Sequence, residues 1–324
     1  MTEEVLIPII KCPYDLYVID EENDAIEKSI QWGKDIGILK QDSNFDKTAN
    51  ACYYMRPYEF GPEKYLFLCK FILFLFTLDD IADSLSNEVE VEKMIEMFDL
   101  LKNMFTDNIA FPEQKAEDNA RMNAIREISK DVHKFFDIPS LRLKRVFKHF
   151  FASMKMEIKI NKKKQGWQVY EYELYRLYTV GTELALELSI PLINNAVDDS
   201  LAHLQCFYAA YESCMKITYL INDLVGLSKE LKENSSCNYV ICVRKETKTW
   251  QEAVNETAEL LKTELKAFEL SLKFIPYECV SNRGEVEAFI NYWRDCIQLT
   301  FRHSYESSRY NFHLNSKIGI PTII

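Results

Sequence analysis

Residues 219–230 read YLINDLVGLSKE, an apolar segment of helical character with polar side chains set into it at regular spacing. Positions four apart lie on one face of an α-helix, so Asn222, Gly226 and Glu230 form a line. Two oxygen-bearing side chains on either side of a glycine can hold a hard cation, and they can equally form a solvated stripe. The stretch therefore predicts a helix and leaves its chemistry to be decided by the rest of the chain.

The composition favours a helical protein with a large core. The 324 residues are 48% hydrophobic but include only 8 glycines and 9 prolines, and a shortage of turn-forming residues implies few, long elements. No repeat or flexible linker divides the chain, so we expect one all-α domain. Its motif-bearing core covers about 50–310, between an N-terminal segment (1–18) and a C-terminal tail (311–324). Helical periodicity predicts helices over about 20–36, 61–84, 89–106, 113–136, 139–161, 167–195, 198–231, 249–273 and 282–310.

The charge and the cysteines argue against several classes of protein. A formal net charge of −11 suits nucleic acid poorly, because that binding depends on neutralising phosphates. Nine cysteines without zinc-ligand spacing indicate reduced thiols of a cytoplasmic protein, and the acidic start lacks the basic residues of a signal peptide. The most apolar run, 65–78, is too short to span a membrane. We therefore expect no nucleic-acid partner and no membrane span.

A second acidic motif ends an apolar helix at 71–83, which reads FILFLFTLDDIAD. Asp79 and Asp83 lie one turn apart on one face, and Asp80 flanks them. Three neighbouring carboxylates repel one another unless a positive charge lies among them, and Mg²⁺ is a hard cation that prefers oxygen ligands. A solvated helix end is the alternative interpretation, and this motif alone leaves both open.

Together the two motifs resemble those of class I terpene synthases of the microbial type, which occur in bacteria, fungi and social amoebae. These enzymes carry a D-D-x-x-D motif and, at a similar separation, an N-D-x-x-S-x-x-x-E motif. Residues 79–83 match the first motif, and residues 222–230 match the second except at Gly226, where the family usually has serine.

Four further residues extend the resemblance to about residues 50–310, and the family's fold, a helical bundle around a central active-site cavity, is therefore expected here. The family has a diphosphate-sensing arginine 46 residues before the motif asparagine, and position 176 is Arg. An Arg-Tyr pair that binds diphosphate ends the family's last long helix, as Arg309-Tyr310 does here, and Lys229 matches another diphosphate contact. The resemblance implies that these four side chains bind diphosphate.

The resemblance also implies a metal centre of three Mg²⁺ ions, with Mn²⁺ as an alternative. Asp79 would bind metal directly, and Asp80 and Asp83 would bind it or support the ligands. Asn222 and Glu230 would hold another ion. Ions and basic side chains together would stabilise the charge of a departing diphosphate.

The remaining carbocation would need a pocket that excludes water. Phe76 lies one turn before Asp79, and Trp293 lies on the last long helix, so both are candidates to line that pocket, although either suits a plain core position. The resemblance further implies a break in the predicted helix near Val180 and Gly181, where a backbone carbonyl would face the substrate.

The expected activity is that of a terpene synthase, a carbon–oxygen lyase acting on phosphates. It would ionise a linear isoprenyl diphosphate and convert the cation to a terpene hydrocarbon or alcohol. Farnesyl diphosphate is the favoured substrate, with geranyl and geranylgeranyl diphosphates as alternatives, and a homodimer is plausible. A chain-elongating isoprenyl diphosphate synthase and a helical binding protein that has lost catalysis are the competing interpretations.

Gly226 is the one departure within the second motif. Ser228 cannot replace the missing serine, because two residues turn by about 200° around a helix. We expect a vacancy between Asn222 and Glu230 that a water molecule fills, with weaker magnesium affinity rather than lost activity. Serine at position 226 is expected to lower the magnesium requirement, and close helix packing at the glycine is the alternative explanation.

Overall fold

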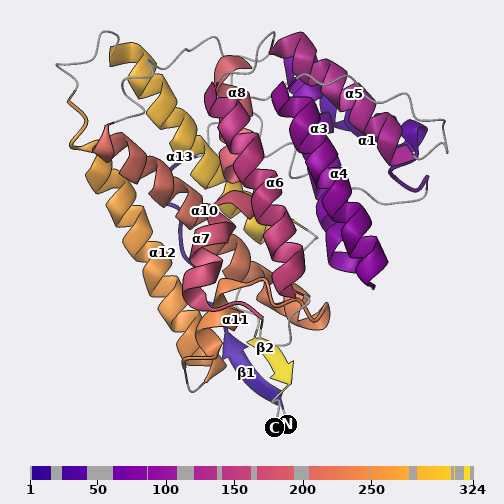
Figure 1. Ribbon diagram of the computed structural model, residues 1–324. Helices are drawn as coiled ribbons and strands as arrows, with labels where there is room; N and C mark the ends of the chain where they lie inside the picture. The colour runs from indigo at the N-terminus through magenta and orange to yellow at the C-terminus, as the bar shows by residue number, and fades with distance from the viewer. Residues whose placement is uncertain are drawn as a thin grey trace. The chain divides into compact units, whose positions relative to one another are not determined.

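Helices make up almost all of the regular structure in the computed structural model (Figure 1). The helices are α1 (Ala25–Ile36), α3 (Pro62–Ser84), α4 (Glu88–Asp107), α5 (Ala120–Phe135), α6 (Leu141–Asn161), α7 (Val169–Thr179), α8 (Thr182–Leu192), α10 (Gln205–Lys232), α11 (Tyr239–Arg244), α12 (Trp250–Leu272) and α13 (Arg283–Glu306). The structure describes residues 2–15, 24–41, 61–85, 87–107, 120–136, 141–161, 166–192, 204–247, 249–276, 283–307, 310 and 317–321. The all-α prediction is confirmed.

The structure differs at three places from the elements that helical periodicity predicts. The helix predicted over 167–195 is divided into α7 and α8 at Gly181, the break that the resemblance implies, and the φ of 78° there is a left-handed value that glycine adopts without strain. The short helix α11 was not predicted. Nor were the strands β1 (Thr2–Leu6) and β2 (Lys317–Pro321), which pair antiparallel with Thr2 opposite Pro321.

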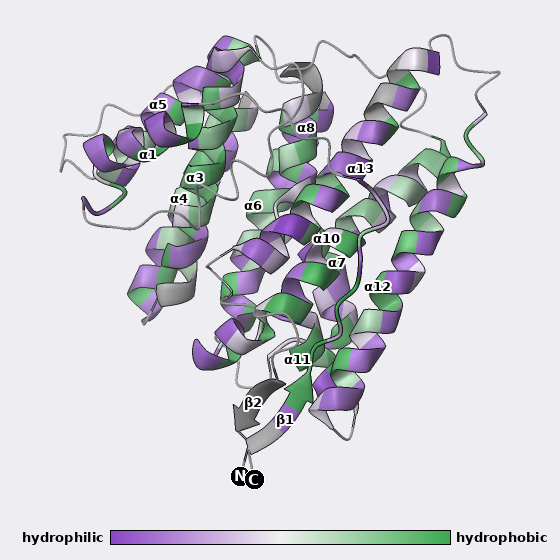
Figure 2. Ribbon diagram, turned by 180° about the vertical axis from the view of Figure 1, so that it is seen from behind, coloured by the Kyte–Doolittle hydropathy of each residue, from purple (hydrophilic) through white to green (hydrophobic). Residues whose placement is uncertain are grey.

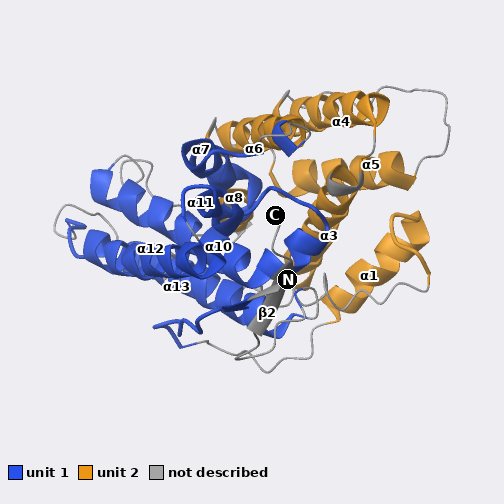
Figure 3. Cartoon of the chain, turned by 90° about the horizontal axis from the view of Figure 1, so that it is seen from below, with its two compact units in different colours: residues 1–18, 160–182, 195–324 blue, residues 19–159, 183–194 orange. Residues whose placement is uncertain are grey.

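The chain divides into two compact units (Figure 3). Unit 1 comprises residues 1–18, 160–182 and 195–324, and unit 2 comprises residues 19–159 and 183–194. The single domain expected from the sequence stays a prediction, and each unit is described by itself.

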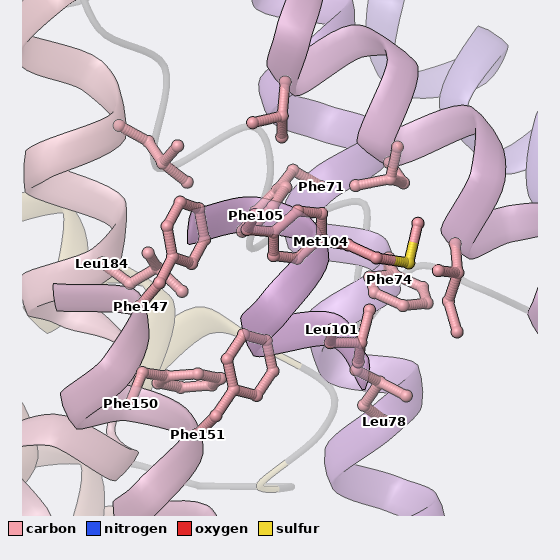
Figure 4. Packing of buried hydrophobic residues seen from close by; sticks show 14 of the residues in the cluster. Phe71, Phe74, Leu78, Leu101, Met104, Phe105, Phe147, Phe150, Phe151 and Leu184 are labelled. Carbon is pink, nitrogen blue, oxygen red and sulfur yellow. The ribbon is translucent and has the colours of Figure 1, made fainter. Parts of the chain in front are cut away.

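Unit 2 has a core rich in phenylalanine. The rings of Phe105 and Phe147 have centroids 4.9 Å apart, and Phe151 stacks on Phe147 at 6.4 Å with an interplanar angle of 10° (Figure 4). Phe71 of α3 contacts both Phe105 and Phe147. Each ring is buried, which stabilises the fold by about 1.5–3 kcal/mol per side chain. The apolar run of α3 is thus a core helix, as its composition predicts.

Unit 1 is built around α10, which packs against α12 and α13. Hydrophobic and hydrophilic residues alternate around α12, as expected of a helix with one face in a core (Figure 2). Its start is fixed by a capping box in which the Thr249 hydroxyl accepts a bond from the Glu252 amide. Among the described residues, no helix combines the length and the apolarity needed to cross a membrane.

The N-terminal segment is held along unit 1 by side chains of α12 and α13 that hydrogen-bond to its backbone. Gln251 of α12 exchanges two bonds with the backbone of Leu6, at 2.8 and 3.0 Å. The Tyr305 hydroxyl of α13 donates to the carbonyl of Ile10 and accepts from its amide, both at 3.0 Å. These contacts, together with β1–β2 pairing, make residues 2–10 an integral part of the unit.

Candidate active site

The second motif lies in the C-terminal part of α10, within unit 1. Asp223 is fully buried and Glu230 is 8% exposed, whereas Asn222 is half-buried. Buried carboxylates require partners, because removing a charge from water is costly. The surrounding elements supply these partners.

Asp223 accepts three hydrogen bonds, two from residues of α7 and one from the first residue of α11. The Tyr172 hydroxyl donates to it at 2.6 Å, the Tyr239 amide at 2.9 Å and Arg176 Nη2 at 3.2 Å. Burial raises the pKa of Asp223, and the Arg176 charge opposes that rise. Arg176 also lies over the Tyr172 ring, with its guanidinium carbon 5.9 Å from the ring centroid. Asp223 therefore anchors the predicted diphosphate-sensing arginine to α10.

Asn222 joins two of the predicted site residues. Its side-chain oxygen accepts from Arg176 Nη2 at 3.4 Å, and its amide nitrogen donates to the Tyr310 hydroxyl at 2.6 Å. Residues that are 46 and 88 positions away in the sequence thus meet at one side chain. Arg176, Asn222 and Tyr310 are brought together as the sequence predicts, whereas Arg309 lies outside the described residues.

Glu230 is held by Asn238, the residue that caps α11, whose side-chain nitrogen donates a hydrogen bond to Oε2 of Glu230. Burial raises the pKa of Glu230 to about 8, and the neighbouring Asp223 charge adds to the rise. Among the described residues no hydrogen bond is made to Oε1. A buried carboxylate with one oxygen unengaged suits a positively charged ligand, and an amide oxygen and a carboxylate oxygen are ligands that Mg²⁺ prefers. Asn222 and Glu230 therefore fit a cation site.

The expected vacancy beside Gly226 is not present. A Cβ atom at this position would lie 2.9 Å from Glu230 Oε1 and 3.6 Å from Cε1 of Tyr310. The space over the glycine is thus taken by the Glu230 carboxylate itself, and the prediction of an open gap there was wrong. A side chain at this position would move the Glu230 carboxylate from where it lies.

Lys229 and the helix break are both present in unit 1. Lys229 Nζ lies 2.7 Å from the Glu233 carboxylate, so in this structure it pairs along its own helix. Val180 ends α7 and Gly181 turns the chain, which places the predicted break where the resemblance implies it. The roles of Lys229, Val180 and Gly181 toward a substrate stay predictions.

The aspartate motif lies at the end of α3, in unit 2. Asp79 is half-buried and Asp80 is exposed, while nothing is described of the Asp83 side chain. Phe76, one turn earlier, is half-buried against the cluster around Tyr65. Among the described side chains no group of three His, Cys, Asp or Glu residues is arranged to hold a metal ion. The metal role of the aspartates stays a prediction.

Trp293 occupies a core position in unit 1. It is fully buried, and its ring centroid lies 4.6 Å from that of Phe207, 5.6 Å from that of Tyr211 and 6.2 Å from that of Phe268. This aromatic packing explains its place on α13 without a ligand. Its assignment to a substrate pocket stays a prediction.

Three residues of the site were missed in the sequence, namely Tyr172, Asn238 and Tyr239. Asn238 carried a readable signal, because an asparagine before the apolar run 239–243 is a favoured helix N-cap. The Tyr172 hydroxyl and the Tyr239 amide carried none, since their partner Asp223 is 51 and 16 residues away.

Comparison with known proteins agrees with this geometry. Residues 70–267, more than half of the chain, match the family model described as terpene synthase family 2, C-terminal metal binding. A 103-residue stretch is 28% identical to silphinene synthase from Penicillium patulum, and that match spans 32% of this chain and 28% of the relative. The chain therefore matches about a quarter of the length of this curated relative.

Solved structures show the same fold. Eudesmol synthase superposes with a TM-score of 0.79 at 15% identity, over 93% of this chain and all of the other. A linalool/nerolidol synthase from Streptomyces clavuligerus, in complex with 2-fluorogeranyl diphosphate, gives a TM-score of 0.78 at 14% identity with the same coverage. The family match shows that the chain belongs to the class I terpene synthases, and these solved structures show that it shares their fold.

Proposed function

We propose that the protein is a Mg²⁺-dependent terpene synthase that ionises farnesyl diphosphate and converts the carbocation to a sesquiterpene hydrocarbon or alcohol, with release of diphosphate. One observation carries the proposal. Arg176, Asn222 and Tyr310 form a continuous hydrogen-bonded chain at the face of α10 that also presents Glu230. A guanidinium, an amide, a phenol and a carboxylate together suit a ligand made of a metal cation and a diphosphate.

Each side chain has a definite task in this proposal. Arg176 would bind diphosphate oxygens with its planar fork, while Asp223 keeps it oriented. The Tyr310 hydroxyl would donate a further hydrogen bond to the leaving group. Asn222 and Glu230 would hold one of three divalent cations, and Asp79 with its neighbours would hold the others. Bound cations supply positive charge that neutralises the diphosphate as it departs.

Water exclusion is the second requirement, because an allylic cation reacts readily with water. Little solvent reaches the polar residues around the second motif on α10, since the exposed fractions are 0% for Asp223 and Asn238 and 8% for Glu230. Polar groups act more strongly in such surroundings. The geranyl diphosphate analogue bound to the related linalool/nerolidol synthase supports an isoprenyl diphosphate as the class of substrate. The free thiols of the described cysteines agree with the cytoplasmic location that we propose.

The test is to incubate the purified protein with MgCl₂ and, separately, with geranyl, farnesyl and geranylgeranyl diphosphates. Diphosphate release is measured, and extracts are analysed by gas chromatography and mass spectrometry. We expect a terpene from farnesyl diphosphate, and its loss in Asp79→Ala and Arg176→Ala. Lys262→Ala, which removes an exposed ion pair on α12, is the matched control and should keep full activity.

Two outcomes would replace the proposal. A longer diphosphate formed after addition of isopentenyl diphosphate would identify a chain-elongating enzyme. Stabilisation by Mg²⁺ and diphosphate with no product from any of the three substrates would identify a binding protein.

A further inference from the structure

Asn238 is a fully buried polar residue that belongs to neither sequence motif. It caps α11, where its side-chain oxygen accepts from the amides of Val240 at 2.8 Å and Ile241 at 3.3 Å. Its side-chain nitrogen donates to the backbone carbonyl of Asp223 at 2.7 Å and to Glu230 Oε2. An asparagine side chain offers two donor hydrogens and two acceptor lone pairs. All four are therefore in use.

This arrangement determines which oxygen of Glu230 is presented to a ligand. A glutamate carboxylate rotates freely unless a partner holds it, since its terminal torsion has broad minima. Asn238 engages Oε2, and Oε1 then lies over Gly226, on the helix face shared with Asn222. The second donor bond, to the Asp223 carbonyl, fixes Asn238 itself to α10. The carboxylate is thus oriented from outside its own helix.

We propose that Asn238 is a positioning residue for cation binding, which turns Oε1 of Glu230 toward Asn222 and couples that orientation to the formation of α11. The inference rests on the proposed function, because it assigns Glu230 to a metal. Side chains that orient a metal ligand contribute strongly to affinity, and their loss typically lowers it by about 10–100-fold.

A residue that served only as a helix cap would behave differently. Asn238→Ser and Asn238→Asp both keep an oxygen that can cap α11, but each removes the amide nitrogen that donates to Glu230 Oε2. Thr249→Ala removes the corresponding cap of α12, which has no contact with Glu230, and is the matched control for lost capping alone.

The experiment measures thermal unfolding of each variant during titration with MgCl₂ at a fixed concentration of inorganic diphosphate. We expect Mg²⁺ to raise the melting temperature of wild type. The Asn238→Ser variant should need at least about tenfold more Mg²⁺ to reach half of its own rise in melting temperature. Thr249→Ala should unfold earlier without ligand yet keep the wild-type Mg²⁺ midpoint. Because Asn238 acts through Glu230, adding Asn238→Ser to Glu230→Gln should not raise the midpoint further.

The outcomes separate this inference from the proposed function. A wild-type Mg²⁺ midpoint in a folded Asn238 variant, beside normal stabilisation of wild type, overturns the positioning role and leaves the proposed function standing. The Asp variant gives the same measurement if the Ser variant does not fold. An additional rise in the double variant also overturns it. Wild type that neither responds to Mg²⁺ and diphosphate nor forms a product overturns both.

Discussion

The amide nitrogen of Asn222 donates to the hydroxyl of Tyr310 across 2.6 Å, and this bond joins the middle of α10 to a residue that follows α13. The oxygen of the same side-chain amide accepts a hydrogen bond from Arg176. The asparagine is therefore oriented from both sides, with its oxygen toward the guanidinium and its nitrogen toward the phenol. A change at either neighbour alters the direction in which that oxygen points.

Tyr310→Phe is expected to lower kcat/KM about tenfold or more while costing about 1 kcal/mol of stability, because one partly buried hydrogen bond is lost. Steady-state diphosphate release measures the first effect and urea denaturation the second. Tyr305→Phe is the control. Its hydroxyl bonds to the backbone of Ile10 in the N-terminal segment, so stability should fall with little change in kcat/KM. Equal loss of rate in both variants would contradict the orienting role of Tyr310.

Asp223→Ala is expected to destabilise the protein by about 3–5 kcal/mol, since it removes the buried carboxylate to which Arg176 and Tyr172 donate. Urea denaturation measures the change. The contrast is Lys229→Ala, which breaks a pair with half-exposed Glu233 and should cost under about 1 kcal/mol. If the two variants were equally stable, the ion pair within unit 1 would not be the anchor described for Arg176.

Gly226→Ala is expected to raise the Mg²⁺ concentration needed for half-maximal rate. The new methyl carbon would lie only 2.9 Å from Oε1 of Glu230, so this oxygen must move away. Thermal stability should be unchanged or higher, as alanine is favoured over glycine in a helix by about 1 kcal/mol. Gly226→Ser should require less Mg²⁺ than Gly226→Ala, since its hydroxyl adds an oxygen beside the carboxylate. A serine variant that needs more Mg²⁺ than the alanine variant would show that the hydroxyl does not assist.

Glu183 of α8 provides a pH dependence in unit 2. Burial, with the charge of Glu187 as a second cause, raises its pKa from an ordinary 4.5 to about 7. The folded protein thus binds one more proton than the unfolded chain between about pH 4.5 and 7, so its free energy of unfolding falls as pH rises through that window. The effect is on the order of 3 kcal/mol when complete.

Glu183→Gln is expected to remove this slope and raise the melting temperature at pH 8, with little change at pH 5. Glu187→Gln is the matched control, because Glu187 accepts from Arg142 at 2.6 Å and is 4% exposed. Its loss should lower the melting temperature at pH 8. Calorimetry at both pH values distinguishes the two, and a Glu183→Gln protein with an unchanged pH slope would contradict the assignment.

Much of the fold could be predicted because it is written in local patterns. The apolar run of α3 and the 3.6-residue periodicity of α12 both identify their helices directly. Arg176, Asn222 and Tyr310 were predicted as site residues from motif spacing, and the structure brings them together. The strands and α11 were missed, because five-residue and six-residue segments give weak periodic signals.

The partners of the motif could not be read from the sequence in the same way. Asp223 adjoins Asn222 in the sequence, yet its carboxylate is buried in the core and accepts a hydrogen bond from Tyr172. The Gly226 vacancy was inferred from a missing side chain, whereas the orientation of Glu230 depends on Asn238, on a separate helix. Such contacts join residues through tertiary structure, and no local pattern encodes them.

The pairing of Thr2 with Pro321 has a consequence for the order in which the protein folds. On the ribosome β1 is synthesised before its partner strand, and residues 7–316 are made between the two. Residues 19–159 of unit 2 leave the ribosome while two of the three segments of unit 1 are still unmade. Since contacts between such distant residues form slowly, closure of the strand pair is expected to be among the last steps of folding.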